Sequence, residues 1–191
     1  MGKSASGKDS VYTKLLRALP FLKKVVSYST RPMRSGETEG ETYHFVTEEF
    51  LSEAEKEGKL IESRTYQTVY GPWSYATVDD GQIDLAKGSY LITATLESFR
   101  KLREYFGKEN VVPLYLEVED GERLKRALLR EYVQKKPAYQ EMCRRFLADC
   151  EDFSEEKLAE AGIERRFQND DVIRCMREIA DLIKSETDAR E

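Results

Sequence analysis

Two glycines and a lysine near the start of the chain have the spacing of a phosphate-binding loop. The stretch from Gly2 to Lys8 reads GKSASGK and fits the pattern G-x-x-x-x-G-K. Glycines allow the main chain to curl until successive N–H groups point at phosphate oxygens, and the lysine adds a positive charge at the outer phosphates. The alternative is a glycine- and serine-rich tail that matches by chance.

The residues after this stretch favour the phosphate-binding interpretation. Val11, Leu15, Ala18 and Leu19 recur at helical spacing, and Pro20 ends the pattern. Such a helix directs its positive N-terminal end at the anion that the loop binds. We therefore expect a phosphate loop followed at once by a helix.

The residue after the lysine departs from the usual pattern. A Ser or Thr hydroxyl commonly holds magnesium at this position, whereas this chain has Asp9 followed by Ser10. A carboxylate is also an oxygen ligand that magnesium accepts, so Asp9 is a candidate metal ligand, directly or through water. The alternative is that Asp9 only stabilises the first turn of the helix through the helix dipole.

A second group of phosphate-binding side chains lies in SYSTRPMRSGETEGETYHF, residues 27–45. Arg31 and Arg34 are three residues apart in a loop too short to bury them, and paired guanidinium groups can hold a dianion. Tyr43 could add its hydroxyl to the same phosphate, and the carboxylate of Glu62 suits the N–H donors of a guanine edge. Taken alone, the arginines would be expected to form surface ion pairs with nearby glutamates, but a phosphate loop in the same chain favours the anion site.

The bulk properties indicate one soluble domain of ordinary size. The chain has 191 residues, of which 40% are hydrophobic and 35% charged, and a net charge of −5. It has no apolar run of membrane-spanning length and no signal-peptide pattern before the loop. The negative net charge argues against a general nucleic-acid binder. We therefore expect a cytoplasmic protein that binds small anions and neither nucleic acid nor membrane.

Cysteine and histidine usage gives no sign of a metal site. Cys143, Cys150 and Cys175 are odd in number, lack metal-ligand spacing and occupy apolar helical positions. We expect buried thiols in a reducing cytoplasm. His44 alternates within a strand-like run and is expected to serve packing.

Strand and helix patterns alternate along the chain and predict an α/β fold. Apolar and β-branched runs predict strands at 24–28, 43–46, 60–66, 69–77, 90–95 and 111–118. Helical periodicity predicts helices at 47–56, with Thr47 as the N-terminal cap, near Phe99, Leu124 and Phe146, and at 171–183. We expect a parallel sheet with a small β-rich insertion early in the chain and a long basic helical insertion after the last strong strand.

With these motifs, the chain resembles the guanylate kinase family. The resemblance runs through S-x-S-T-R-x-x-R-x-G-E-x-x-G-x-x-Y-x-F, then L-I-E, Y-G and Asn169-Asp170-Asp171. It implies transfer of the ATP γ-phosphate to GMP with Mg²⁺. It also implies a P-loop NTPase core with a parallel sheet (1–26, 85–122 and 146–191), a β-rich NMP-binding region (27–84) and a helical lid (123–145). The small-molecule partners would be ATP and GMP, and the protein a monomer or homodimer.

The resemblance also implies roles for individual residues. Lys8, Arg130 and Arg145 would act on the transferring phosphate, with Arg126 and Arg144 as nearby alternatives. The implied ATP-binding residues are Gly2, Ser4, Ser6, Gly7, Lys8, Asp9, Ser10 and Asn169. The implied GMP-binding residues are Ser27, Arg31, Arg34, Tyr43, Glu62 and Tyr70. The phosphate loop and the arginine pair should then face each other across the length of one phosphoryl group.

Two departures from the family pattern concern the acceptor. The strand-like run YLITATLES has Thr93 and Thr95 where an acid is usual, and YGPWSYAT has Pro72 and Trp73 where a Ser or Thr would touch guanine. These departures leave two alternatives open. One is a kinase of the same fold for another phosphorylated acceptor, such as a sugar phosphate. The other is a non-catalytic module that docks phosphorylated partners.

A third departure concerns the strand that normally leads into a phosphate loop. Only Met1 precedes Gly2 in this sequence. Losing about five buried apolar side chains, at ~1.5–3 kcal/mol each, would remove roughly 7–15 kcal/mol, comparable with the whole stability of a domain. We therefore expect the natural chain to be longer, with Met1 ending that strand, and otherwise a gap in the sheet.

Overall fold

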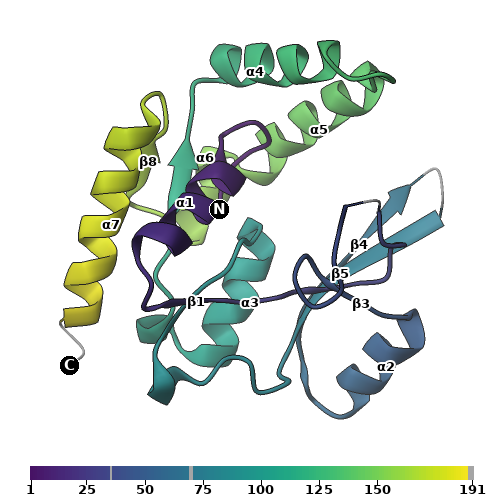
Figure 1. Cartoon of the computed structure of the whole chain (residues 1–191), viewed down its shortest axis with the longest axis vertical. Coiled ribbons are helices and arrows are strands. Elements are labelled where there is room, and N and C mark those ends of the chain that lie inside the picture. Colours follow the sequence, from purple (N-terminus) through teal and green to yellow (C-terminus); the bar gives the residue numbers. More distant parts are fainter. Residues whose placement is uncertain (35, 69–70, 189–191) are drawn as a thin grey trace. The chain divides into compact units, whose positions relative to one another are not determined.

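The computed structural model describes residues 1–34, 36–68 and 71–188, and the chain traced in Figure 1 has a mixed α/β fold. Two compact units form within it, and each is described by itself. The first unit comprises Met1–Pro20, Thr93–Phe99 and the chain from Val112 onward. The second comprises Phe21–Ile92 and Arg100–Val111. Helix α3 (Leu96–Phe106) begins in the first unit and continues into the second.

The first unit is built on a pair of parallel strands, β7 (Tyr115–Glu117) and β8 (Arg166–Gln168). Met1 lies along β7: its ammonium group donates to Leu114 O at 2.7 Å, and the Leu116 N–H donates to Met1 O at 2.9 Å. Leu114 and Leu116 flank Tyr115 of β7. Hydrogen bonds from one residue to both neighbours of the residue opposite it are the pattern of a parallel ladder. The main chain therefore enters the phosphate loop alongside β7.

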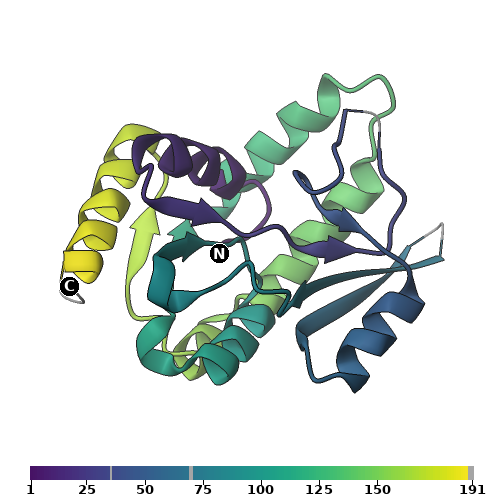
Figure 2. The same cartoon turned by 60° about the horizontal axis from the view of Figure 1, so that its bottom comes forward.

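Apart from α3, the described part of the first unit contains five helices. They are α1 (Lys8–Ala18), α4 (Asp120–Tyr132), α5 (Tyr139–Asp152), α6 (Glu155–Glu160) and α7 (Val172–Asp188). α1 and α7 lie side by side, and α7 also packs against β8 (Figure 2). α4 packs on α5, and Glu119 caps α4 by accepting the Glu122 N–H at 2.9 Å.

The second unit contains two sheets. β1 (Leu22–Lys24) pairs in parallel with β6 (Ser89–Leu91). The other sheet has the order β3-β2-β5-β4, formed by β3 (His44–Phe45), β2 (Tyr28–Ser29), β5 (Gly71–Val78) and β4 (Leu60–Thr68). β4 and β5 are antiparallel, as is β2 with β5, whereas β2 and β3 are parallel. Two short 3₁₀ turns, Leu85–Lys87 and Lys108–Asn110, complete this unit.

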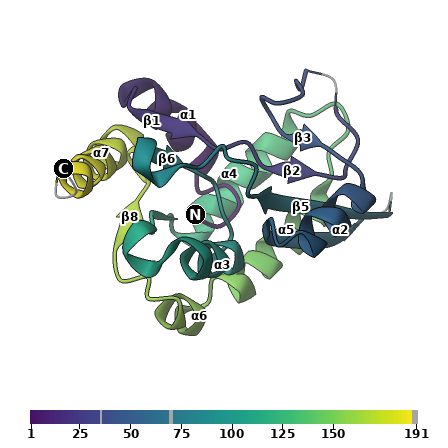
Figure 3. The ribbon, with the colours of Figure 1, turned by 90° about the horizontal axis from the view of Figure 1, so that it is seen from below.

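Helix α2 (Glu48–Lys56) packs on β4 and β5 (Figure 3). Thr47 caps it by accepting the Phe50 N–H at 3.3 Å, as the sequence predicts. The apolar core between helix and sheet consists of Tyr28, Leu51, Ala54, Ala76 and Val78. This core fixes the strand ends from which the Arg31 loop leaves.

Several sequence-based expectations need correction. The expected strand at 24–28 is two strands, β1 and β2, and the expected strand at 111–118 is limited to β7. The sequence analysis missed β8 and α6, which are too short for a periodicity signal. The prediction that all three thiols are buried is confirmed for Cys175. It is wrong for Cys143, which is exposed, and for Cys150, which is half-buried. No helix in the described ranges has the length and apolar character needed to cross a bilayer.

The buried face of α7 yields a test of the first unit's core. Ile179 is fully buried, whereas Ile173 on the same helix is 68% exposed. We predict that Ile179→Ala lowers the free energy of unfolding by about 2–4 kcal/mol because it leaves a cavity. Ile173→Ala should change it by less than about 0.5 kcal/mol. Urea denaturation followed by circular dichroism measures both, and equal midpoint shifts would contradict this core assignment.

Candidate phosphate-binding sites

The stretch from Gly2 to Lys8 forms a tight loop, as its sequence predicts. Ser6 N–H donates to Lys3 O at 3.2 Å, and Ala5 (φ 61°) and Gly7 (φ 84°) are both left-handed. Among the described residues, Ala5 is the only residue other than glycine with positive φ. Such turns make successive N–H groups converge on an anion. The first unit therefore has a loop with the backbone conformation of an anion-binding site at the start of α1.

Asn169 supports this loop from the end of β8. Its Nδ2 donates to Ser6 O at 2.7 Å, and the side chain is 5% exposed. A Cβ atom at Gly7 would lie 2.5 Å from the same Nδ2, so glycine is required there by both space and conformation. Arg126 Nη1 in turn donates to Asn169 O at 3.1 Å. The structure thus brings Asn169 to the loop, where it supports the main chain.

Lys8, Asp9 and Ser10 form the first turn of α1. Lys8 is half-buried, and Asp9 and Ser10 are exposed. Thr13 Oγ1 donates to the backbone oxygen of Asp9 at 2.9 Å. Among the described residues, no side chain donates a hydrogen bond to the Asp9 carboxylate. Across residues 1–34, 36–68 and 71–188 no group of three or more His, Cys, Asp or Glu could hold a metal ion. A single carboxylate beside a phosphate site suits Mg²⁺, which usually takes one or two carboxylates plus substrate phosphates and waters.

The two predicted lid arginines differ in their relation to the loop. Arg145 on α5 reaches it: Nη2 lies 3.5 Å from Ser4 Oγ. Arg130 is exposed on α4. Of the alternatives, Arg144 pairs with Glu141 at 2.7 Å and Arg126 with Glu122 at 3.0 Å.

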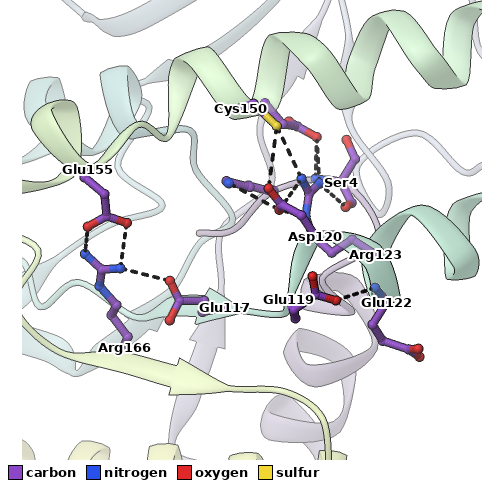
Figure 4. Close-up of polar contacts among 11 residues, drawn as sticks. Ser4, Glu117, Glu119, Asp120, Glu122, Arg123, Cys150, Glu155 and Arg166 are labelled. Carbon is purple, nitrogen blue, oxygen red and sulfur yellow. Dashed lines mark hydrogen bonds and ion pairs between the residues drawn. The ribbon is translucent and has the colours of Figure 1, made fainter.

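The sequence analysis missed Arg123, although it named this residue as the start of the lid. Arg123 is 1% exposed and donates from Nη1 to Ser4 O at 3.0 Å, while its Nη2 donates to Asp120 Oδ1 at 2.8 Å (Figure 4). Burial alone would raise the pKa of Asp120, but hydrogen bonds from Arg123 lower it below its usual value. The sequence did offer a signal for its burial. Arg123 lies one helical turn before Ala127, on the buried face of α4.

A cavity of about 360 Å³ adjoins β7 in the same unit. Two carboxylates of its lining, Glu155 and Glu117, pair with Arg166 at 2.9 Å and 3.0 Å, as Figure 4 shows. Lys3 pairs with Asp120 at 3.4 Å. The lining carboxylates Glu117, Asp120 and Glu155 are therefore already paired with cations.

Arg31, in the second unit, is not exposed as its loop position predicted. Its side chain is 4% exposed and its guanidinium binds both carboxylate oxygens of Glu37, with Nη1–Oε2 at 2.7 Å and Nη2–Oε1 at 2.5 Å. It also lies over the rings of Tyr43, at 5.1 Å, and Phe45, at 5.3 Å. The ion pair expected under the alternative interpretation is therefore present, and a carboxylate occupies the fork that a phosphate would use.

The carboxylate of Glu37 also accepts the Arg34 N–H at 2.7 Å. The hydrogen bonds from Arg31, and next that from the Arg34 backbone, lower the pKa of Glu37 to about 2. The guanidinium of Arg34 is exposed and lies 5.9 Å from the Trp73 ring. The Arg31 guanidinium and the Arg34 backbone thus share one carboxylate, and the Tyr43 ring packs against Arg31.

The remaining predicted acceptor residues are placed separately. Glu62 is buried on β4, accepts the Thr77 hydroxyl at 2.8 Å and lies 3.7 Å from Arg64 Nε. Ser27 is half-buried, and its carbonyl accepts the His44 N–H at 2.9 Å. Tyr70 lies outside the described residues.

The two departures in the acceptor region have local structural roles. Thr95 Oγ1 accepts the Ser98 N–H at 3.2 Å at the start of α3. Pro72 and Trp73 lie in β5, opposite Gln67 and Tyr66 of β4.

The close approach of Asn169 to the loop yields a prediction. We expect Gly7→Ala to weaken magnesium–ATP binding at least about tenfold, because the added Cβ strains the left-handed backbone and displaces Asn169. Gly58 is the matched control, since it has φ 69° but nothing within 4 Å of an added Cβ. Gly58→Ala should cost about 1 kcal/mol of stability and leave binding unchanged. Calorimetric titration measures binding, and wild-type affinity in Gly7→Ala would contradict the assignment.

The Arg31–Glu37 pair yields a pH-dependent prediction. Because the folded-state pKa of Glu37 is about 2 against an ordinary 4.5, the pair stabilises the fold above pH 4.5 and is lost as pH falls through about 2. Glu37→Gln should therefore lower the melting temperature at pH 7, and the difference from wild type should shrink toward pH 2. Glu55→Gln, at an exposed position of α2, is the control. A difference independent of pH would contradict this prediction.

Comparison with known proteins identifies the relatives of the chain. The family model described as "Guanylate kinase" matches residues 1–84. A guanylate kinase of Chromobacterium violaceum is 35% identical over 83 residues, which cover 41% of this chain and 40% of that protein. "Guanylate kinase 2, chloroplastic/mitochondrial" of Oryza sativa subsp. japonica is 32% identical over 130 residues, covering 67% of this chain and 44% of that protein.

The fold extends this similarity along the chain. The crystal structure of guanylate kinase from Anaplasma phagocytophilum superposes with a TM-score of 0.68 at 22% identity, covering 97% of this chain and 84% of that one. By sequence, the chain spans about two fifths of the length of the curated relatives that it matches, 40% and 44% for the two above. The matched residues contain both the phosphate loop and the Arg31/Arg34 segment. The chain belongs to the guanylate kinase family.

Proposed function

We propose that the chain transfers the γ-phosphate of ATP to GMP, giving ADP and GDP. The observation that carries this proposal is the loop from Gly2 to Lys8, held in a left-handed turn by buried side chains and followed directly by α1. Phosphoryl transfer asks a protein mainly to align two anions and to neutralise the charge that moves between them. A loop of this kind supplies the site for the donor.

On the donor side, Gly2, Ser4, Ser6, Gly7 and Ser10 form the loop and the first turn that surround the phosphates. Lys8 places its charge at the outer phosphates, and Arg145 and Arg130 add positive charge from α5 and α4. The position of Arg145 beside Ser4 supports its role. Asp9 would hold Mg²⁺, which supplies charge neutralisation between the donor phosphates. Asn169 belongs to the same ATP site through its contact with the loop.

On the acceptor side, Arg31, Arg34 and Tyr43 bind the phosphate of GMP. That phosphate takes over the guanidinium fork that Glu37 occupies, and its higher charge favours the exchange. Ser27, Glu62 and Tyr70 complete the acceptor pocket, with the buried carboxylate of Glu62 accepting hydrogen bonds from the guanine edge.

We assign the same three-part organisation that the family resemblance implies. The core (1–26, 85–122 and 146–191) contains the loop, residues 27–84 bind the acceptor, and residues 123–145 form the lid. Three free thiols fit the cytoplasm as the location.

A second candidate function is a kinase of the same fold for another phosphorylated acceptor. The observation in its favour is that Thr95 serves to cap α3, where an acid that reads the acceptor base is usual. A coupled assay of ADP production with a panel of acceptors separates the candidates. Turnover with GMP alone supports the first, turnover with a sugar phosphate supports the second, and no turnover with any acceptor leaves a docking module.

The acceptor assignment yields a kinetic prediction. We expect Arg34→Ala and Arg31→Ala to raise the KM for GMP at least about tenfold while the KM for ATP stays within about twofold. Arg34 is exposed, so its variant tests binding without loss of a buried charge. Arg177→Ala, at an exposed position of α7, is the control and should change neither constant. An equal rise in both Michaelis constants would place the arginines outside the acceptor pocket.

A further inference from the structure

The buried guanidinium of Arg123 contacts the main chain of the phosphate loop. Its Nη1 donates to Ser4 O at 3.0 Å, and its Nε and Nη2 donate to Asp120 Oδ1 at 3.0 and 2.8 Å. The Phe146 ring centroid lies 4.5 Å from it. Burying a charge is unfavourable unless it is paired and hydrogen-bonded, and Arg123 meets both conditions. This arginine is therefore built into the support of the loop.

Asp149 on α5 binds the backbone N–H of Ser4, the residue whose carbonyl oxygen Arg123 binds. Ser4 N–H donates to Asp149 Oδ2 at 2.7 Å, and Arg123 Nη1 lies 3.6 Å from that oxygen. The two polar backbone groups of Ser4 are thus held by two oppositely charged side chains that also attract each other. We call Arg123 and Asp149 the Ser4 clamp. It joins α4, α5 and the loop within the first unit.

The Ser4 clamp acts next to the strained position of the loop. Ala5 is left-handed at φ 61°, a conformation that side chains other than glycine rarely adopt. Its φ angle sets the orientation of the peptide plane that contains Ser4 O, and Arg123 fixes that oxygen. Strained backbone persists only where the surroundings over-determine it. Arg123 therefore supplies the restraint that keeps Ala5 in its anion-binding conformation.

The Ser4 clamp also sets the position of a proposed catalytic arginine. Arg145 lies one helical turn before Asp149 on α5, and its Nη2 is 3.5 Å from Ser4 Oγ. Because Asp149 ties this part of α5 to the Ser4 amide, it holds Arg145 near the loop. The charges of Arg123 and Lys3 are balanced by Asp120 and Asp149, so the network adds no net charge.

We propose that Arg123 and Asp149 are positioning residues for phosphoryl transfer, which hold the phosphate loop and Arg145 in the arrangement that binds the donor phosphates. They act through Ser4 and touch no substrate atom. This inference rests on the proposed function only in taking ATP as the ligand of the loop.

The test compares three variants of the full chain on α5. Asp149→Ala removes the acceptor of the Ser4 N–H, while Arg123 keeps Asp120 and Ser4 O as partners, so the variant should fold. Asp149→Asn keeps an acceptor oxygen at that place. Asp152→Ala, at the exposed end of the same helix, is the control. Affinity for magnesium–ATP and for GMP is measured by calorimetric titration, and the exchange rate of the Ser4 amide by NMR.

We expect Asp149→Ala to weaken magnesium–ATP binding at least about tenfold, the loss typical of one charge-assisted hydrogen bond. Affinity for GMP should stay within about twofold. Asp149→Asn should restore ATP affinity to within about threefold of wild type, and Asp152→Ala should match wild type. Equal ATP affinity in folded Asp149→Ala and wild type would overturn the proposal, as would equal loss in the Ala and Asn variants.

The amide measurement separates this inference from the proposed function. If the wild-type chain binds no ATP, the proposed function is contradicted, but the Ser4 clamp is still tested. Ser4 should then exchange its amide proton at least about tenfold faster in Asp149→Ala than in wild type or Asp152→Ala. Unchanged exchange would show that Asp149 does not hold the loop.

Discussion

The proposed donor site depends on two carbonyl oxygens of the loop from Gly2 to Lys8, which are held by buried side chains. Arg123 binds Ser4 O and Asn169 binds Ser6 O, one on each side of the left-handed Ala5. With its carbonyl groups held in this way, the loop can direct its N–H groups at an anion without rearranging. Such preorganised dipoles are effective because the protein has already met the cost of orienting them during folding. Gly7 follows from the same constraint, since Asn169 leaves no room for a side chain.

The proposed acceptor site follows a different principle. Arg31 is buried, and a buried guanidinium requires a counter-charge, which Glu37 provides. The carboxylate resembles a phosphate in charge and in its two-point contact, so the site is already shaped for an anion. A phosphate ligand then exchanges one charged partner for another instead of meeting an unpaired cation. The aromatic rings of Tyr43 and Phe45 hold the guanidinium in place throughout.

The sequence predicted the features that repeat or have fixed spacing. The loop, the helix behind it, the Thr47 cap and the α/β class all follow from local patterns and were confirmed. The burial of Arg31 and the Arg123–Asp149 pair were missed, because both depend on contacts between distant segments. Asp149 and Ser4 are 145 positions apart, and no local pattern reveals such a partner. The short elements β8 and α6 were missed because three and six residues carry too little periodicity.

The central claim is that the phosphate loop and the arginine pair serve one transfer reaction. Lys8 belongs to the first unit and Arg31 and Arg34 to the second, so their opposition remains a prediction. The most direct measurement is the affinity of a bisubstrate ligand, adenosine and guanosine joined through five phosphates, compared with ATP and GMP separately. If the two sites face each other, linkage makes the second contact intramolecular, and the joined ligand should bind one per chain and at least about 100-fold more tightly than either nucleotide. An affinity no better than that of the tighter single nucleotide would contradict the account.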